Sequence, residues 1–79
     1  MTNAVPVIYS KPGCSACTWT KIQFDEKGLE YTIVDITKSE DAYNEVVALG
    51  YQQMPVVYAS EDNHWSGRNP QKIAELAAA

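Results

Sequence analysis

Short apolar runs alternate with longer mixed segments along this chain, a pattern typical of strands alternating with amphipathic helices. Runs rich in β-branched and aromatic residues predict strands at 4–9, 31–36 and 56–59. A tight turn at 61–63 predicts that residues 63–66 return as a fourth strand in a hairpin. Apolar residues spaced three and four positions apart predict helices at about 14–27, 40–49 and from 70 onward.

The expected helix ends follow from local capping signals. Thr37 and Glu40 match a capping box before the second helix, and Ser39 is an alternative N-cap. The last helix is expected to use Asn69 as its cap and Pro70 in its first turn. The second helix is expected to bury one broad apolar face, formed by Ala42, Tyr43, Val46, Val47 and Leu49. The last helix is expected to bury a stripe formed by Ile73, Leu76 and Ala77.

The order of the expected elements is βαβαββα. A strand, a crossover helix and a strand predict a parallel pair with a right-handed connection, and the closing hairpin adds an antiparallel pair. The expected fold is therefore α/β, with a four-stranded mixed sheet and three helices on its faces. At 79 residues, the chain is expected to form one domain over 1–79 with one small core.

The charge pattern excludes several functions. Six basic residues stand against ten acidic ones and form no run, so the electrostatic signature of nucleic-acid binding is missing. No segment is apolar enough to span a membrane, and the first residues lack the features of a signal peptide. We therefore expect a monomeric cytoplasmic protein without nucleic-acid or membrane partners, in a compartment that keeps thiols reduced.

Candidate chemistry is concentrated in the only two cysteines, Cys14 and Cys17, which lie between the first strand and the first helix. The unpaired N–H groups and the positive dipole end of a helix start favour a thiolate, and Lys11 adds a nearby positive charge. We expect Cys14 to attack a substrate disulfide and Cys17 to resolve the mixed disulfide, leaving a redox-active Cys14–Cys17 bond. Pro12 and Gly13 are expected to shape the approach of the substrate.

Two features near this pair have alternative interpretations. A zinc or cluster site would use both cysteines, but only His64 remains as a good third ligand, so we expect no bound metal or cofactor. Pro55 either begins the third strand in trans or forms a cis bond that turns the Met54 backbone toward the cysteines. The residues alone favour the trans form.

The first helix has two competing apolar stripes, one with Ala16, Trp19 and Ile22 and one with Cys17, Thr20 and Phe24. Trp19 therefore packs in the core beside Ile22 or belongs to an exposed apolar rim. The other members of such a rim would be Tyr51, Met54 and Trp65. Trp65 is expected to be half-buried, whereas His64 and Lys21 are expected to be solvated surface residues.

Three segments together resemble a known family: Tyr9-Ser10-Lys11-Pro12-Gly13-Cys14-Ser15-Ala16-Cys17, Met54-Pro55-Val56-Val57 and His64-Trp65-Ser66-Gly67. Over residues 5–76 the chain is similar to glutaredoxin-like redoxins, and most of all to the NrdH-redoxin group, the dithiol electron donors of class Ib ribonucleotide reductase. The resemblance implies a thioredoxin-like fold of the glutaredoxin type and a cis Met54–Pro55 bond. It also implies reduction by thioredoxin reductase and NADPH, ribonucleotide reductase as a partner, and docking beside Trp65, Ser66 and Gly67.

Two departures from related patterns concern the reductant and the partner contacts. The NrdH pattern continues with Phe-Arg-Pro and an acidic residue, whereas this chain has Arg68-Asn69-Pro70-Gln71. Glutathione-using glutaredoxins carry a Gly-Gly and an acidic pair in the same region, and Ser66-Gly67-Arg68-Asn69 lacks those carboxylates. The resemblance therefore implies weak or no glutathione binding. A glutathione-dependent glutaredoxin and a metal- or cluster-binding module remain the alternatives.

Overall fold

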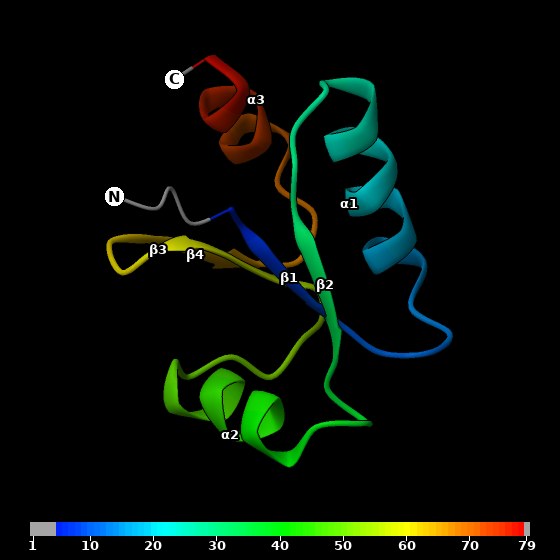
Figure 1. Cartoon of the computed structure of the whole chain (residues 1–79), viewed down its shortest axis with the longest axis vertical. Helices are drawn as coiled ribbons and strands as arrows, with labels where there is room; N and C mark the ends of the chain where they lie inside the picture. The colour runs from blue at the N-terminus through cyan, green and yellow to red at the C-terminus, as the bar shows by residue number, and fades with distance from the viewer. Residues whose placement is uncertain (1–4, 79) are drawn as a thin grey trace.

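The computed structural model describes residues 5–78, in which strands and helices follow the expected βαβαββα order (Figure 1). The elements are β1 (Val7–Ser10), α1 (Ser15–Glu26), β2 (Thr32–Asp35), α2 (Glu40–Ala48), β3 (Val56–Ser60), β4 (Asn63–Ser66) and α3 (Pro70–Ala78). The strands form one sheet in the order β2-β1-β3-β4. β1 is parallel to β2 and antiparallel to β3, and β3 and β4 form the hairpin. The predicted mixed-sheet α/β fold is confirmed, and Ala4, the expected first strand residue, lies outside the described residues.

The sheet separates two apolar layers, with α1 and α3 on one face and α2 on the other (Figure 1). Successive residues of a strand point to opposite faces, so Ile8 and Tyr9 of β1 belong to different layers. Ile8 packs in the layer under α1 and α3, together with Phe24, Val57, Trp65 and Ile73. Tyr9 packs in the layer under α2, together with Ala42, Val46 and Val56. The sheet therefore holds α1, with the cysteine pair at its start, on one fixed face.

At the start of α2, the predicted capping box of Thr37 and Glu40 does not form. Ser39 is the N-cap, because its Oγ accepts the N–H of Ala42 at 3.2 Å. Thr37 instead donates its hydroxyl at 2.6 Å and its backbone N–H at 2.8 Å to the Asp35 carboxylate. These two hydrogen bonds, the hydroxyl bond first, hold the pKa of Asp35 below its ordinary value. Thr37 is thus bound to the end of β2, and the alternative cap, Ser39, is confirmed.

The Ser39 cap leads to a prediction about the stability of the protein. Replacing Ser39 with alanine removes the acceptor for the Ala42 N–H, and we expect the free energy of unfolding to fall by about 1 kcal/mol. Ser15→Ala, at an exposed position in the first turn of α1, is the matched control, and we expect a change below about 0.5 kcal/mol. Urea denaturation of both variants measures the difference, and equal midpoints would contradict the capping role of Ser39.

The buried face of α2 is narrower than the sequence predicts. Ala42 and Val46 are buried one turn apart, whereas Tyr43 and Val47 are each 52% exposed. A helix packed flat on a sheet buries residues at i and i+4, and the neighbouring positions turn about 100° away from that stripe. The expectation that Tyr43 and Val47 are buried is therefore wrong, and both lie on the surface beside the cysteine site.

The cap of α3 is confirmed, because the Asn69 side-chain oxygen accepts the backbone N–H of Lys72 at 3.1 Å. Ile73 is fully buried and Leu76 partly buried against the α1 side of the sheet. Ala77 is exposed, so its expected place in the buried stripe is wrong. α3 therefore contacts the core mainly through Ile73.

Candidate active site

The segment between β1 and α1 places the cysteine pair at the start of a helix. Gly13 has φ 73°, a left-handed conformation that glycine adopts without strain, and it turns the chain into α1. Cys14 is the N-cap of α1, and its Sγ accepts the backbone N–H of Cys17 at 3.1 Å. Cys17 lies one turn further and is only 3% exposed, whereas Cys14 is partly exposed. The two sulfurs form a disulfide, in which Cys14 is the more exposed residue.

The first turn of α1 surrounds the Cys14 sulfur with groups that favour negative charge. The Cys17 N–H points at this sulfur, and the helix dipole places its positive end at the same point. The Cys14 carbonyl accepts the Thr18 N–H at 3.2 Å and the Thr18 hydroxyl at 3.4 Å, which fixes the turn. Such an arrangement stabilises a thiolate over a thiol, the form that attacks disulfides.

The loop before β3 forms one wall of the site. The Met54–Pro55 peptide bond is cis, as the family resemblance implies and contrary to the trans form that the residues alone favour. The carbonyl oxygen of Met54 lies 3.6 Å from the Sγ of Cys14. Pro55 itself is buried. The backbone next to the disulfide is therefore that of Met54, which is only partly buried.

The end of β4 fixes this loop in place. Gly67 donates its N–H to the Pro55 carbonyl at 2.8 Å, and the Ser66 hydroxyl donates to the Gln53 carbonyl at 2.7 Å. Trp65, by contrast, is 5% exposed and belongs to the core layer under α1 and α3. Trp65 is therefore neither half-buried nor part of an exposed rim, because strand alternation turns it away from the face that Ser66 occupies.

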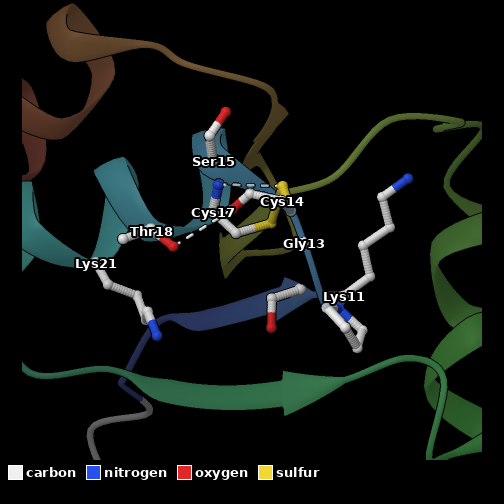
Figure 2. Close-up of a pocket in the computed structure, with 9 residues that line it drawn as sticks. Lys11, Gly13, Cys14, Ser15, Cys17, Thr18 and Lys21 are labelled. Atoms are coloured by element: carbon white, nitrogen blue, oxygen red, sulfur yellow. Dashed lines mark hydrogen bonds between the residues drawn. A yellow bond between two sulfur atoms is a disulfide. The ribbon is translucent and has the colours of Figure 1, made fainter.

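A hollow of about 450 Å³ lies against the disulfide, between the end of β1 and the first turns of α1 (Figure 2). The expected site residues Lys11, Pro12 and Gly13 line it. Four further residues line it that the sequence did not assign to the site: Ser10, Ser15, Thr18 and Lys21. Lys21, expected as a solvated helix residue, is partly buried where it lines this hollow. The sequence did contain an indication that Thr18 and Lys21 lie near the cysteines. They follow Cys14 and Cys17 by four residues, which places them on the same face of the helix.

A second hollow, of about 540 Å³, shares Lys11 and Met54 with the site and extends along α2. Its walls include the exposed side chains of Tyr43 and Val47 together with Tyr51. Met54 and Tyr51, two of the four residues expected in an apolar rim, are thus found here. The rim is completed by α2 rather than by the tryptophans.

Trp19 matches neither of the two alternatives completely, which were core packing beside Ile22 and a place in an exposed apolar rim. It is partly buried and packs against the core layer that contains Phe24, and the Arg68 guanidinium lies 6.0 Å from its ring centre. Ile22, the expected core partner, is 47% exposed. The buried stripe of α1 is therefore the one formed by Cys17, Thr20 and Phe24.

His64 is not the solvated hairpin residue that the sequence suggests. Its Nδ1 lies 2.7 Å from the Tyr51 hydroxyl, and its ring stacks on that of Tyr58 with centres 5.7 Å apart. His64 therefore connects the hairpin to the loop that carries Met54. Within residues 5–78 no three Cys, His, Asp or Glu side chains gather into a metal-binding group.

A cysteine pair at the start of α1, beside the Met54–Pro55 loop of a four-stranded mixed sheet, defines a thiol–disulfide oxidoreductase with a thioredoxin-like fold. The chain belongs to the glutaredoxin family, whose family model matches residues 7–65. It is 36% identical to the glutaredoxin-like protein NrdH of Salmonella typhimurium over 69 residues, which cover 87% of this chain and 84% of that protein. The Escherichia coli NrdH is 32% identical over 72 residues, covering 91% and 88%.

A solved structure supports the same relationship. The NrdH-redoxin of Escherichia coli, a glutaredoxin-like protein described as having a thioredoxin-like activity profile, superposes with a TM-score of 0.86. The match covers 92% of this chain and 95% of that one at 29% identity. The resemblance found in the sequence, including its NrdH-like character, is therefore confirmed. In the part of the chain that the structure describes, no helix combines the length and apolar character needed to cross a membrane.

Proposed function

We propose that this protein carries electrons from NADPH and thioredoxin reductase to a protein disulfide, with ribonucleotide reductase as the substrate protein. The observation that carries the proposal is the Cys14 sulfur, which caps α1 and lies 3.6 Å from the Met54 carbonyl. Residues 1–79 would act as one monomeric redoxin domain in the cytoplasm. The cysteine pair would serve as the redox group, without a bound metal or cofactor.

The chemistry proceeds in two exchange steps. The Cys14 thiolate attacks one sulfur of the substrate disulfide, forming a mixed disulfide, and the other substrate sulfur leaves as a thiolate that takes a proton from solvent. The Cys17 thiolate then attacks the Cys14 sulfur, and the substrate leaves with both sulfurs reduced. Two electrons have passed to the substrate, and thioredoxin reductase returns two to the Cys14–Cys17 disulfide.

The residues around the pair would hold the substrate during these steps. The backbone of Met54, a partly buried residue beside the reacting sulfur, would offer hydrogen-bonding groups to an extended segment. Lys11, Pro12 and Gly13 line the hollow that lies against the two cysteines. Ser66 and Gly67 would act by holding the loop in place, through their hydrogen bonds to the Gln53 and Pro55 carbonyls. Trp65, the residue before them, would anchor this segment to the core because it is buried.

The choice of reductant rests on the segment after β4. Ser66, Gly67, Arg68 and Asn69 stand where glutathione-using glutaredoxins carry carboxylates that hold the tripeptide, and none of these four is acidic. The similarity to NrdH proteins supports the same choice. Thioredoxin reductase is therefore the proposed electron donor.

A paired reductase assay tests this proposal. We expect the oxidised protein to support rapid NADPH oxidation with thioredoxin reductase and a protein disulfide, and little oxidation with glutathione and glutathione reductase. A glutathione-dependent glutaredoxin in the second arm serves as the positive control for that system. Efficient turnover in the glutathione arm alone would instead assign this protein to the glutathione-dependent glutaredoxins.

A further inference from the structure

Charge is distributed unevenly around the cysteine site. The chain has ten acidic and six basic residues, yet no carboxylate lines either hollow beside the disulfide. Lys11 lines both hollows, and Lys21 lines the one between β1 and α1. The other lining residues of that hollow are uncharged, and several present hydroxyl groups. The site is therefore locally positive on a molecule of net charge −4.

The two lysines reach the site from different elements and lie on opposite sides of the pair. Figure 2 shows the Lys11 side chain extending away from the sulfurs on one side. The Lys21 side chain extends on the other side, beyond Thr18. Lys21 is partly buried as a residue, and a lysine of this kind packs its methylene stem against the protein while its ammonium group stays in solvent. An extended chain crossing Cys14 would pass between two separated positive charges.

We propose that the disulfide substrate carries carboxylate side chains on both sides of the cysteine that Cys14 attacks. This inference rests on the proposed function and adds the chemistry of the substrate segment to it. With the substrate cysteine at Cys14 and its backbone along Met54, residues on one side face Lys11 and residues on the other face Lys21. The occupant of the two hollows is thus an acidic, cysteine-bearing protein segment.

Electrostatics also explains how such a segment would find this one place. The acidic remainder of the surface repels an acidic chain, and the two lysines attract it at the disulfide, so encounters are steered toward the productive orientation. A segment with neutral flanks lacks this attraction, and one with basic flanks is repelled by Lys11 and Lys21.

Single-turnover reduction tests the inference without depending on the reductase. Pre-reduced protein is mixed with three disulfide peptides that are identical except for Glu, Gln or Lys at the positions flanking the disulfide. We expect the rate constants to fall in the order Glu, Gln, Lys. Lys21→Gln should lower the Glu-to-Gln rate ratio by about two- to fivefold, and Lys11→Gln together with Lys21→Gln should lower it further. High salt should compress the same ratio.

Lys27→Gln is the matched control, because Lys27 is an exposed lysine at the other end of α1 and lines neither hollow. It changes the net charge equally and should leave the ratio unchanged. A ratio that falls as much for Lys27→Gln as for Lys21→Gln would overturn the inference in favour of net charge alone. Equal rates on all three peptides would also overturn it while leaving the dithiol function intact. Failure to reduce any of them would remove the proposed function itself.

Discussion

Cys14→Ser is expected to abolish disulfide reduction while leaving the fold in place. A serine hydroxyl does not ionise at neutral pH, so the attacking thiolate is lost, and we expect a drop of at least about a thousandfold in rate. The fold should survive because serine is a favoured N-cap, and its oxygen can accept the Cys17 N–H that the sulfur accepts now. Insulin reduction measures the activity, and far-ultraviolet circular dichroism with urea unfolding measures the fold.

Cys17→Ser separates the two roles. With the resolving thiol removed, Cys14 should still attack, and the mixed disulfide with the substrate should accumulate because nothing inside the protein releases it. Intact mass spectrometry would show the adduct, and peptide mapping would place it on Cys14. Accumulation of an adduct on Cys17 in the Cys14→Ser variant would instead reverse the assigned order of attack.

The fold and the position of the cysteine pair were predictable because the signals are local. Ser10, Pro12 and Gly13 break the chain between an apolar run and a helical pattern, and the glycine adopts the positive φ that such a turn requires. Placing Cys14 at the cap follows from where the helix begins. The parallel β1–β2 pair and the β3–β4 hairpin followed from the crossover helix and the tight turn, whereas the antiparallel pairing of β1 with β3 was not predicted. These inferences involve neighbours along the chain, so tertiary contacts did not overrule them.

One failure has a local cause, and the others depend on partners that are distant along the chain. Thr37 fits a capping box until the Asp35 carboxylate binds it, which leaves the cap to Ser39. His64 looks like a solvated residue until the loop before β3 brings Tyr51 within 2.7 Å of its ring. Periodicity also does not specify the width of a buried helix face. Tyr43 was therefore predicted to be buried, although α2 leaves it exposed. The errors at His64 and Tyr43 concern contacts set by the packing of elements, which the sequence pattern does not specify. The error at Thr37 is local, because the Asp35 side chain two positions earlier competes for the capping residue.

The active site itself combines both kinds of information. The cysteines, Lys11 and Gly13 come from one continuous segment, so the sequence identifies them together. Met54 reaches Cys14 across 40 positions of the chain. The residues alone offered this loop only through the disfavoured cis alternative at Pro55, and the family resemblance made it the expected one. Lys21 had no such indication except its helical spacing from Cys17. The attacking thiol is thus encoded locally, whereas the surface that would select a substrate depends on the fold.

Phe24→Ala should have the largest effect on stability among single substitutions on α1. Phe24 is fully buried, packs with Ile8 and Ile73, and meets the Tyr31 ring edge-on with centres 5.5 Å apart. Truncation removes the ring and leaves a cavity beneath the helix that carries the cysteines, at a cost of about 3–5 kcal/mol in the free energy of unfolding. A small domain has only about 5–15 kcal/mol in total, so a measurable unfolded fraction is expected at moderate temperature.

Ile22→Ala provides the control on the same helix for the effect of Phe24. Ile22 is 47% exposed, so little apolar surface returns to water on truncation, and alanine is the better helix former. We expect a change of less than about 1 kcal/mol in the free energy of unfolding, measured by urea denaturation of both oxidised variants. If the two substitutions cost the same, α1 is not anchored to the sheet through Phe24. The fixed position of Cys14 against Met54 would then need another source, with Thr20 and Cys17 as the remaining buried contacts of the helix.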